Sequence, residues 1–128
     1  TDEKRWPSLI GILVAISGTF YLAVGFSLGG ALWITILLVV SAHAASGANW
    51  VLSTILTQKW VEDEMRGRVF SMDMLLMSFS FSISTIVAGW LLEHTSLTIR
   101  QGMIYFACVM IIAGLLFAAW KPNQIQRS

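Results

Sequence analysis

Three polar side chains stand out in this sequence because long apolar stretches flank them, and they could carry acid–base or hydrogen-bonding chemistry. His43, Asn49 and Asp73 each stand among aliphatic, aromatic and small residues. An imidazole changes charge near neutral pH, so His43 could relay a proton or contact a bound molecule, or it could simply bond a neighbouring element. An amide is costly to bury unpaired, so Asn49 is expected either to join two elements or to meet a ligand. Asp73 could carry a proton or form a structural ion pair with Arg66.

Charged residues gather between 59 and 68, where they could form a clamp. Glu64 closes an acidic run, and Arg66, Gly67 and Arg68 follow it closely. The two guanidinium groups could pair with carboxylates, with anionic lipid head groups or with the carbonyl groups at a helix C-terminus. Gly67 would permit a sharp turn between them. The alternative is that the arginines only anchor the chain at a charged surface.

Aromatic and thioether side chains supply a further candidate site. Trp50 shares a helical face with His43, and with Met72, Met74 and Met77 it could line a pocket that adapts to varied apolar compounds. The same residue types also occur where helices pack or face lipid. The sequence holds no credible Ser/His/Asp arrangement, metal-ligand spacing or phosphate-binding loop. We therefore expect neither an enzyme nor a bound cofactor or metal.

The composition indicates what surrounds these residues. Of the 128 residues, 56% are hydrophobic and only 12% are charged, and the mean hydropathy is +0.74. Soluble domains carry about 25% charged residues. This chain cannot cover a water-exposed surface with so few charges, so its apolar excess must face lipid. The net charge of +1 and the lack of a basic run exclude a nucleic-acid partner.

Four stretches are long and apolar enough to cross a bilayer, which takes about 20 residues per helix. Residues 6–58 carry no charge and are too many for one crossing. The paired Gly29 and Gly30 mark the break between two helices there. The sequence therefore predicts an all-α membrane protein with four spanning helices and one charged loop between the second and third. The expected spans are about 8–28, 31–58, 69–92 and 102–120, with the loop over 59–68.

One stretch is ambiguous between strand and helix. Residues 78–84 alternate serine with apolar residues, as half-buried strands do, but a lone strand in lipid would leave its backbone unpaired. Helix is therefore preferred, with four small or polar residues on one face: Ser78, Ser82, Thr85 and Gly89. Gly25 and Gly29 repeat this spacing in the first helix. Small residues four apart let membrane helices approach closely.

Lysine and arginine lie mostly at one end of the four helices. With four crossings, both termini and the loop at 59–68 share one side of the membrane. Seven of the eight basic residues belong to that side: Lys4, Arg5, Lys59, Arg66, Arg68, Lys121 and Arg127. Arg100 alone belongs to the other. Because basic residues favour the cytoplasmic side, the sequence predicts cytoplasmic termini and a cytoplasmic middle loop.

The loop and the helix before it resemble one known family. Residues 60–71 run Trp-Val-Glu-Asp-Glu-Met-Arg-Gly-Arg-Val-Phe-Ser. This is similar to the loop between the tenth and eleventh helices of the major facilitator superfamily, especially in its bacterial drug and siderophore exporters. In residues 47–58, small and polar residues lead into an apolar run and a glutamine, which resembles that family's tenth helix. Glu62 stands where the family usually has a proline.

The resemblance implies that the chain is a C-terminal fragment, the ninth to twelfth helices of a twelve-helix transporter in a bacterial inner membrane. It implies transport by alternating access, with proton-coupled efflux of drug-like or siderophore-like cargo. The partners would be the lipid bilayer, the remaining helices, a small-molecule substrate and protons. Charge pairs of the loop, with Arg66 and Arg68, would hold one state of the transport cycle.

Two alternatives treat the chain as complete in itself. It could be a four-helix transporter similar to the small multidrug-resistance proteins, although these carry a glutamate in their first helix and residues 6–58 contain no acid. It could also be a membrane scaffold that transports nothing, since small-residue faces suit any packed bundle.

Overall fold

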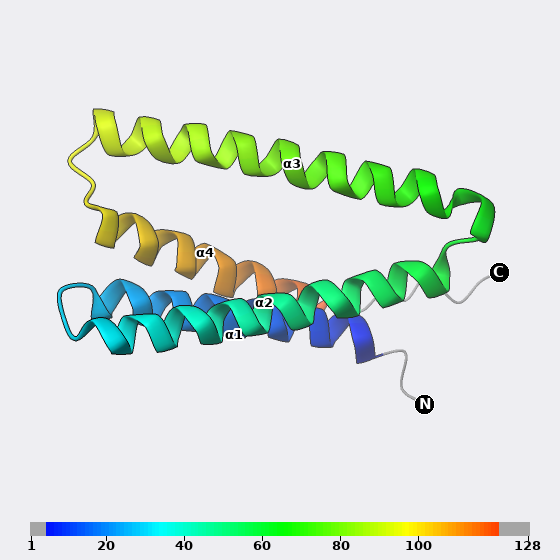
Figure 1. Cartoon of the computed structure of the whole chain (residues 1–128), viewed down its shortest axis with the longest axis horizontal. Coiled ribbons are helices and arrows are strands. Elements are labelled where there is room, and N and C mark those ends of the chain that lie inside the picture. Colours follow the sequence, from blue (N-terminus) through cyan, green and yellow to red (C-terminus); the bar gives the residue numbers. More distant parts are fainter. Residues whose placement is uncertain (1–4, 121–128) are drawn as a thin grey trace.

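The computed structural model of the chain describes residues 5–120, which form four helices that run alternately up and down (Figure 1). They are α1 (Trp6–Ser27), α2 (Leu32–Trp60), α3 (Asp63–His94) and α4 (Ile99–Ala119). All four are long and apolar enough to cross a membrane. No strand occurs within residues 5–120, which confirms the all-α prediction and the choice of helix for residues 78–84. The predicted cytoplasmic residues Lys4, Lys121 and Arg127 lie outside the described range.

The ends of the helices follow from the local sequence. α1 has Pro7 in its first turn, where a missing N–H costs nothing, and it ends just before Gly29, whose φ is +94°. This confirms the predicted break at the glycine pair, and it removes Gly29 from the helical face predicted with Gly25. α4 begins with a capping box. Thr98 Oγ1 accepts from the Gln101 backbone N–H at 3.3 Å, and the Thr98 backbone N–H donates to Gln101 Oε1 at 2.9 Å.

The connection between α2 and α3 is shorter than the predicted loop over 59–68. Both helices extend into that segment, and only Val61 and Glu62 stay outside them. α3 begins at Asp63, and the carboxylates of its first turn favour a helix start because they lie at the positive end of the helix dipole. Gly67 consequently lies inside α3 and not in a turn, so the predicted sharp turn at Gly67 is wrong.

The tightest packing joins α1 to α4, which run antiparallel. Gly11, Gly18 and Gly25 are spaced about two helical turns apart and form a stripe along one side of α1. Gly11 meets the backbone of Gly114, and Gly25 meets the side chain of Ile104. A Cβ at position 11 would lie 2.6 Å from the Gly114 carbonyl O, so only glycine lets the two backbones approach this closely.

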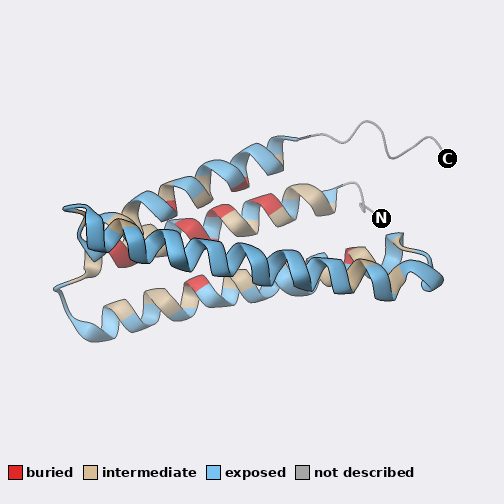
Figure 2. Cartoon of the chain, turned by 90° about the horizontal axis from the view of Figure 1, so that it is seen from above, coloured by how far each residue is buried: buried red, intermediate tan, exposed pale blue. Residues whose placement is uncertain are grey.

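α2 also packs on α1, whereas α3 makes few contacts with the other described helices (Figure 1). No residue of α3 is buried (Figure 2). The small-residue face predicted for α3 meets no other helix within residues 5–120. The Ser82 hydroxyl donates to the Ser78 carbonyl O of the same helix at 2.8 Å, and Gly89 has open space around it. This apolar helix must therefore meet lipid or a further part of the protein.

The bundle has two distinct ends. The start of α1, the α2–α3 turn and the end of α4 lie at one of them, and the two other connections lie at the opposite end (Figure 1). α2 has 29 residues and α3 has 32, which is about 44 and 48 Å of helix. Neither helix fits within about 30 Å of hydrocarbon, even at a tilt of about 40°, the upper end of the usual range. Both helices must therefore extend into the head-group region, where the charged first turn of α3 is well solvated.

Candidate functional site

A row of polar side chains joins α1 to α2. Ser17, only 1% exposed, donates from Oγ to the Ala42 carbonyl O at 3.1 Å, and its Oγ lies 2.8 Å from Ser46 Oγ. Further along α1, Ser27 Oγ lies 3.1 Å from Thr35 Oγ1. Hydroxyl groups in an apolar medium need partners, and these groups find them across the α1–α2 contact. The row therefore holds α2 in a defined register on α1.

His43 stands at the exposed edge of this row. Its Nδ1 lies 2.9 Å from the Val39 carbonyl O of the same helix and 3.4 Å from the Tyr21 hydroxyl O on α1. The Tyr21 and His43 rings meet edge to face, with 5.9 Å between their centroids and 67° between their planes. The bond to the Val39 carbonyl requires a proton on Nδ1, so Nε2 is the nitrogen able to accept a second one. The imidazole is thus oriented by α1 and remains accessible.

Asn49 and Trp50 lie near His43 on α2 and face different surroundings. Asn49 Oδ1 is buried, yet it accepts no hydrogen bond from residues 5–120. Trp50 is 41% exposed and lies two turns from His43 on the same side of the helix. Gly47 stands between these two, with no atom within 4 Å of where a Cβ would be. We call His43, Gly47 and Trp50 the open flank of α2.

Asp73 does not join this group. It is exposed on α3, and its carboxylate makes no hydrogen bond or ion pair with the described residues. The predicted pair with Arg66 is not formed, because seven residues of helix separate the two by about 10 Å along the axis. Arg66 pairs instead with Asp63, one helical turn away, with 2.6 Å between Arg66 Nη2 and Asp63 Oδ1.

Arg66 fastens α2 to α3. The Nη2 that contacts Asp63 also donates to the Gln58 carbonyl O at 2.8 Å, and the Val61 carbonyl O is 3.5 Å away. The carbonyl groups in the last turn of a helix lack helical partners, so a basic side chain beside them is stabilising. One guanidinium group thus holds the end of α2, the turn and the start of α3. We call these four residues the Arg66 clamp.

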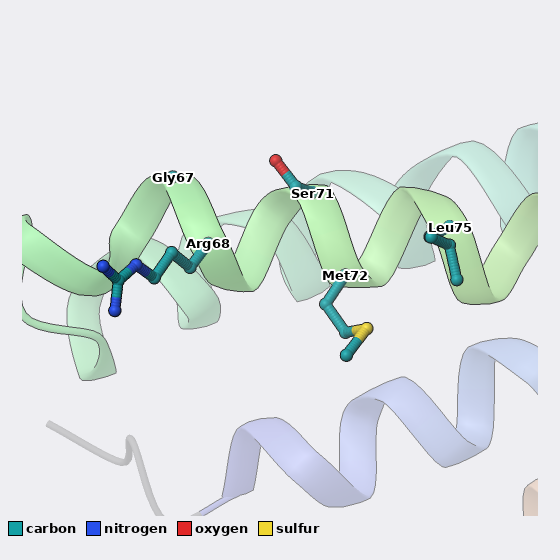
Figure 3. A pocket seen from close by; sticks show the side chains of 5 residues that line it. All are labelled: Gly67, Arg68, Ser71, Met72 and Leu75. Atoms are coloured by element: carbon teal, nitrogen blue, oxygen red, sulfur yellow. The ribbon is translucent and has the colours of Figure 1, made fainter.

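The other predicted members of this segment remain outside the clamp. Glu64 and Arg68 are both exposed, and neither forms an ion pair within residues 5–120. Arg68 borders a shallow, open depression on one side of α3 (Figure 3). The residues that line it are Gly67, Arg68, Ser71, Met72 and Leu75.

Inspection of the sequence missed three contacts that position the site. The glycine stripe of α1 could have been found from its seven-residue spacing, and Ser17 from being a hydroxyl in the middle of an apolar helix. Arg100 gave no such signal. Its Nη2 donates to the Leu28 carbonyl O at the end of α1, so it caps that helix from the start of α4.

Comparison with known proteins identifies the class of this chain. The family model described as Major Facilitator Superfamily matches residues 3–126. The chain therefore belongs to this superfamily, whose members are transporters rather than enzymes. With its four apolar helices, it is a multi-pass membrane protein whose function is transmembrane transport. No curated protein and no solved structure shows significant similarity to it.

Proposed function

We propose that the four helices are the ninth to twelfth of a twelve-helix exporter in a bacterial inner membrane. The termini and the α2–α3 turn would lie in the cytoplasm, as the excess of basic residues at that end suggests. The likeness of residues 47–71 to the tenth helix and following loop of drug and siderophore exporters supports drug-like or siderophore-like cargo. Efflux would proceed by alternating access, driven by exchange with protons.

The observation that carries this proposal is the open flank of α2. His43, Gly47 and Trp50 occupy the middle third of a helix long enough to span a membrane, and all three are exposed within residues 5–120. An imidazole with one nitrogen unbonded is costly against hydrocarbon but suits a water-filled cavity between helices. The flank would thus form one wall of the transport cavity, with the indole of Trp50 as a contact for apolar cargo.

Polar groups beside this flank extend the pathway. His43 Nε2 would take or release the coupled proton, while Tyr21 holds the ring in place. Asn49 Oδ1, buried without a donor among the described residues, would accept a hydrogen bond from cargo, water or a further helix. Asp73, on α3, is a second candidate for carrying the proton.

The Arg66 clamp would act as a gate on the cytoplasmic side. It joins the ends of two helices through contacts that a rocking motion can break. Among the predicted gate residues Glu64, Arg66, Gly67 and Arg68, only Arg66 makes side-chain hydrogen bonds or ion pairs within residues 5–120, so we assign this role to Arg66.

The test begins with cargo and proceeds to His43. Bacterial cells expressing the full transporter are screened for resistance to dyes, drugs and iron chelators against cells with an empty vector, and resistance to none of them contradicts the exporter assignment. For the compound that gives resistance, His43→Gln should flatten the pH dependence of efflux, because glutamine hydrogen-bonds without titrating. The matched control is His94→Gln, which removes the other histidine, at the end of α3. An unchanged pH profile in His43→Gln would show that His43 is structural.

A further inference from the structure

We propose that α3 carries a binding site for one anionic phospholipid, with Arg68 and Ser71 at its phosphate and Met72, Leu75 and Phe79 along an acyl chain. This site is independent of the cargo pathway on α2. It assigns a function to Arg68, which takes no part in the Arg66 clamp.

The five residues form a strip down one side of α3. Their spacing of three, four, seven and eleven residues from Arg68 keeps them on one face of a helix. Arg68, Ser71, Met72 and Leu75 line the same open depression (Figure 3). Met72, Leu75 and Phe79 are 58%, 60% and 62% exposed, so no described helix covers the strip.

The length of the strip matches one leaflet of a bilayer. Eleven residues of helix from Arg68 to Phe79 span about 16 Å, and half of the hydrocarbon core is about 15 Å. Because α3 is too long to fit within the hydrocarbon, its charged first turns lie at the head groups. A lipid with its phosphate beside Arg68 would therefore have its chain beside Phe79 near the centre of the membrane.

The polar end of the strip suits a phosphate group. The Arg66 guanidinium group binds within the clamp. The Arg68 guanidinium group, in contrast, makes no hydrogen bond or ion pair within residues 5–120, and Glu64 one turn earlier does not pair with it. A guanidinium group offers parallel donors that match two phosphate oxygens. Ser71 adds a hydroxyl donor one turn away. Gly67 has no atom within 4 Å of where a Cβ would be, so the depression is open above Arg68.

A phospholipid fits this strip better than a soluble phosphate does. A soluble phosphate would use the arginine and the serine and leave the three apolar side chains without a role. A lipid contacts both parts, and the negative head group complements the one arginine of this segment that has no acidic partner among the described residues.

Native mass spectrometry of the purified full-length transporter in mild detergent tests the site. The probe is phosphatidylglycerol, compared with phosphatidylcholine of the same acyl chains. We expect phosphatidylglycerol to bind more tightly and Arg68→Gln to weaken it about fivefold, the usual contribution of one basic residue at an anionic surface. The affinity of Arg68→Lys for phosphatidylglycerol should lie between those of the wild type and Arg68→Gln. Lys59→Gln is the matched control, because it removes one charge from α2 beside Trp6, where the Lys59 Nζ lies 4.7 Å from the ring centroid.

A second arm separates the lipid from its head group. Glycerophosphoglycerol, the soluble head group, should not displace the lipid at equal concentration, because it cannot contact Met72, Leu75 or Phe79. Displacement by it would overturn the lipid assignment. Equal binding of phosphatidylglycerol and phosphatidylcholine would also overturn it. Unchanged binding of phosphatidylglycerol in Arg68→Gln would overturn it too, and is the result expected if another part of the transporter covers this face.

Discussion

Replacing Gly11 with alanine should force α1 and α4 apart. A Cβ at position 11 would lie 2.6 Å from the Gly114 carbonyl O and 2.8 Å from the Ala118 Cα. Both are backbone atoms, so no side-chain rotation relieves the clash. The Ala118 backbone N would be closer still, so the helices must separate locally by about 1 Å to reach 3.4 Å, where ordinary contact begins.

The size of the effect follows from that separation. A gap of about 0.5–1 Å forfeits a quarter to a half of the dispersion energy between facing atoms. Overpacked cores lose about 1–3 kcal/mol. Because most of the buried residues in the described chain lie on α1 and α4, we expect Gly11→Ala to lower the free energy of unfolding by about 2 kcal/mol, roughly thirtyfold in the equilibrium constant.

The assay is reversible unfolding of the purified full-length transporter in mixed micelles, with the fraction of denaturing detergent as the variable. Gly47→Ala is the control, since it also adds a methyl group in mid-helix but meets nothing within 4 Å. Gly11→Ala should unfold at a lower detergent fraction than both the control and the wild type. If Gly11→Ala and Gly47→Ala unfold together, the close α1–α4 contact is not what stabilises the bundle.

Three further substitutions test the polar contacts. Ser17→Ala removes the hydrogen-bond partner of the Ala42 carbonyl O and of the Ser46 hydroxyl, which lie 3.1 and 2.8 Å from Ser17 Oγ. Thermal unfolding in detergent should show that the free energy of unfolding falls by about 0.6–1.7 kcal/mol. Wild-type stability would mean that the row does not hold α2 on α1. Arg66→Gln should slow efflux of the compound found by screening at equal expression. Asp63→Asn should slow it less, because the bond from Arg66 to the Gln58 carbonyl remains. Normal efflux in Arg66→Gln contradicts the gate.

The four helices could be predicted from sequence because lipid leaves the backbone no other way to pair its polar groups. The ends of α2 and α3 could not. Low charge marks the part of a helix that lies in hydrocarbon, but a helix can continue into the head-group region, where charge costs little. Asp63 and Glu64 carry the charge that suggested a loop, yet the same negative charge stabilises a helix N-terminus and so favours the start of α3.

Which helices pack against each other could not be predicted from the sequence. The small-residue face of α3 near Ser82 and Gly89 satisfies the same rule as the glycine stripe of α1, yet only the stripe meets another described helix. The difference is that Gly114 of α4 lies opposite Gly11, which no single-helix pattern reveals. His43 and Asn49 stood out through their polarity alone, whereas the bond from His43 to Tyr21 depends on which helix lies beside α2.

Cysteine accessibility on α2 tests the central claim most directly, that its open flank lines a cavity reached from both sides of the membrane in turn. The native Cys108, which is half-buried in α4, is first replaced with alanine. Gly47→Cys in the full transporter should then react with a membrane-impermeant maleimide, both in intact cells and in inverted vesicles. Ser46→Cys, at nearly the same depth but about 100° around the helix, faces α1, where the native hydroxyl lies 2.8 Å from Ser17 Oγ, and should react more slowly. Protection of Gly47→Cys from both sides, or equal reaction at the two positions, would contradict the account.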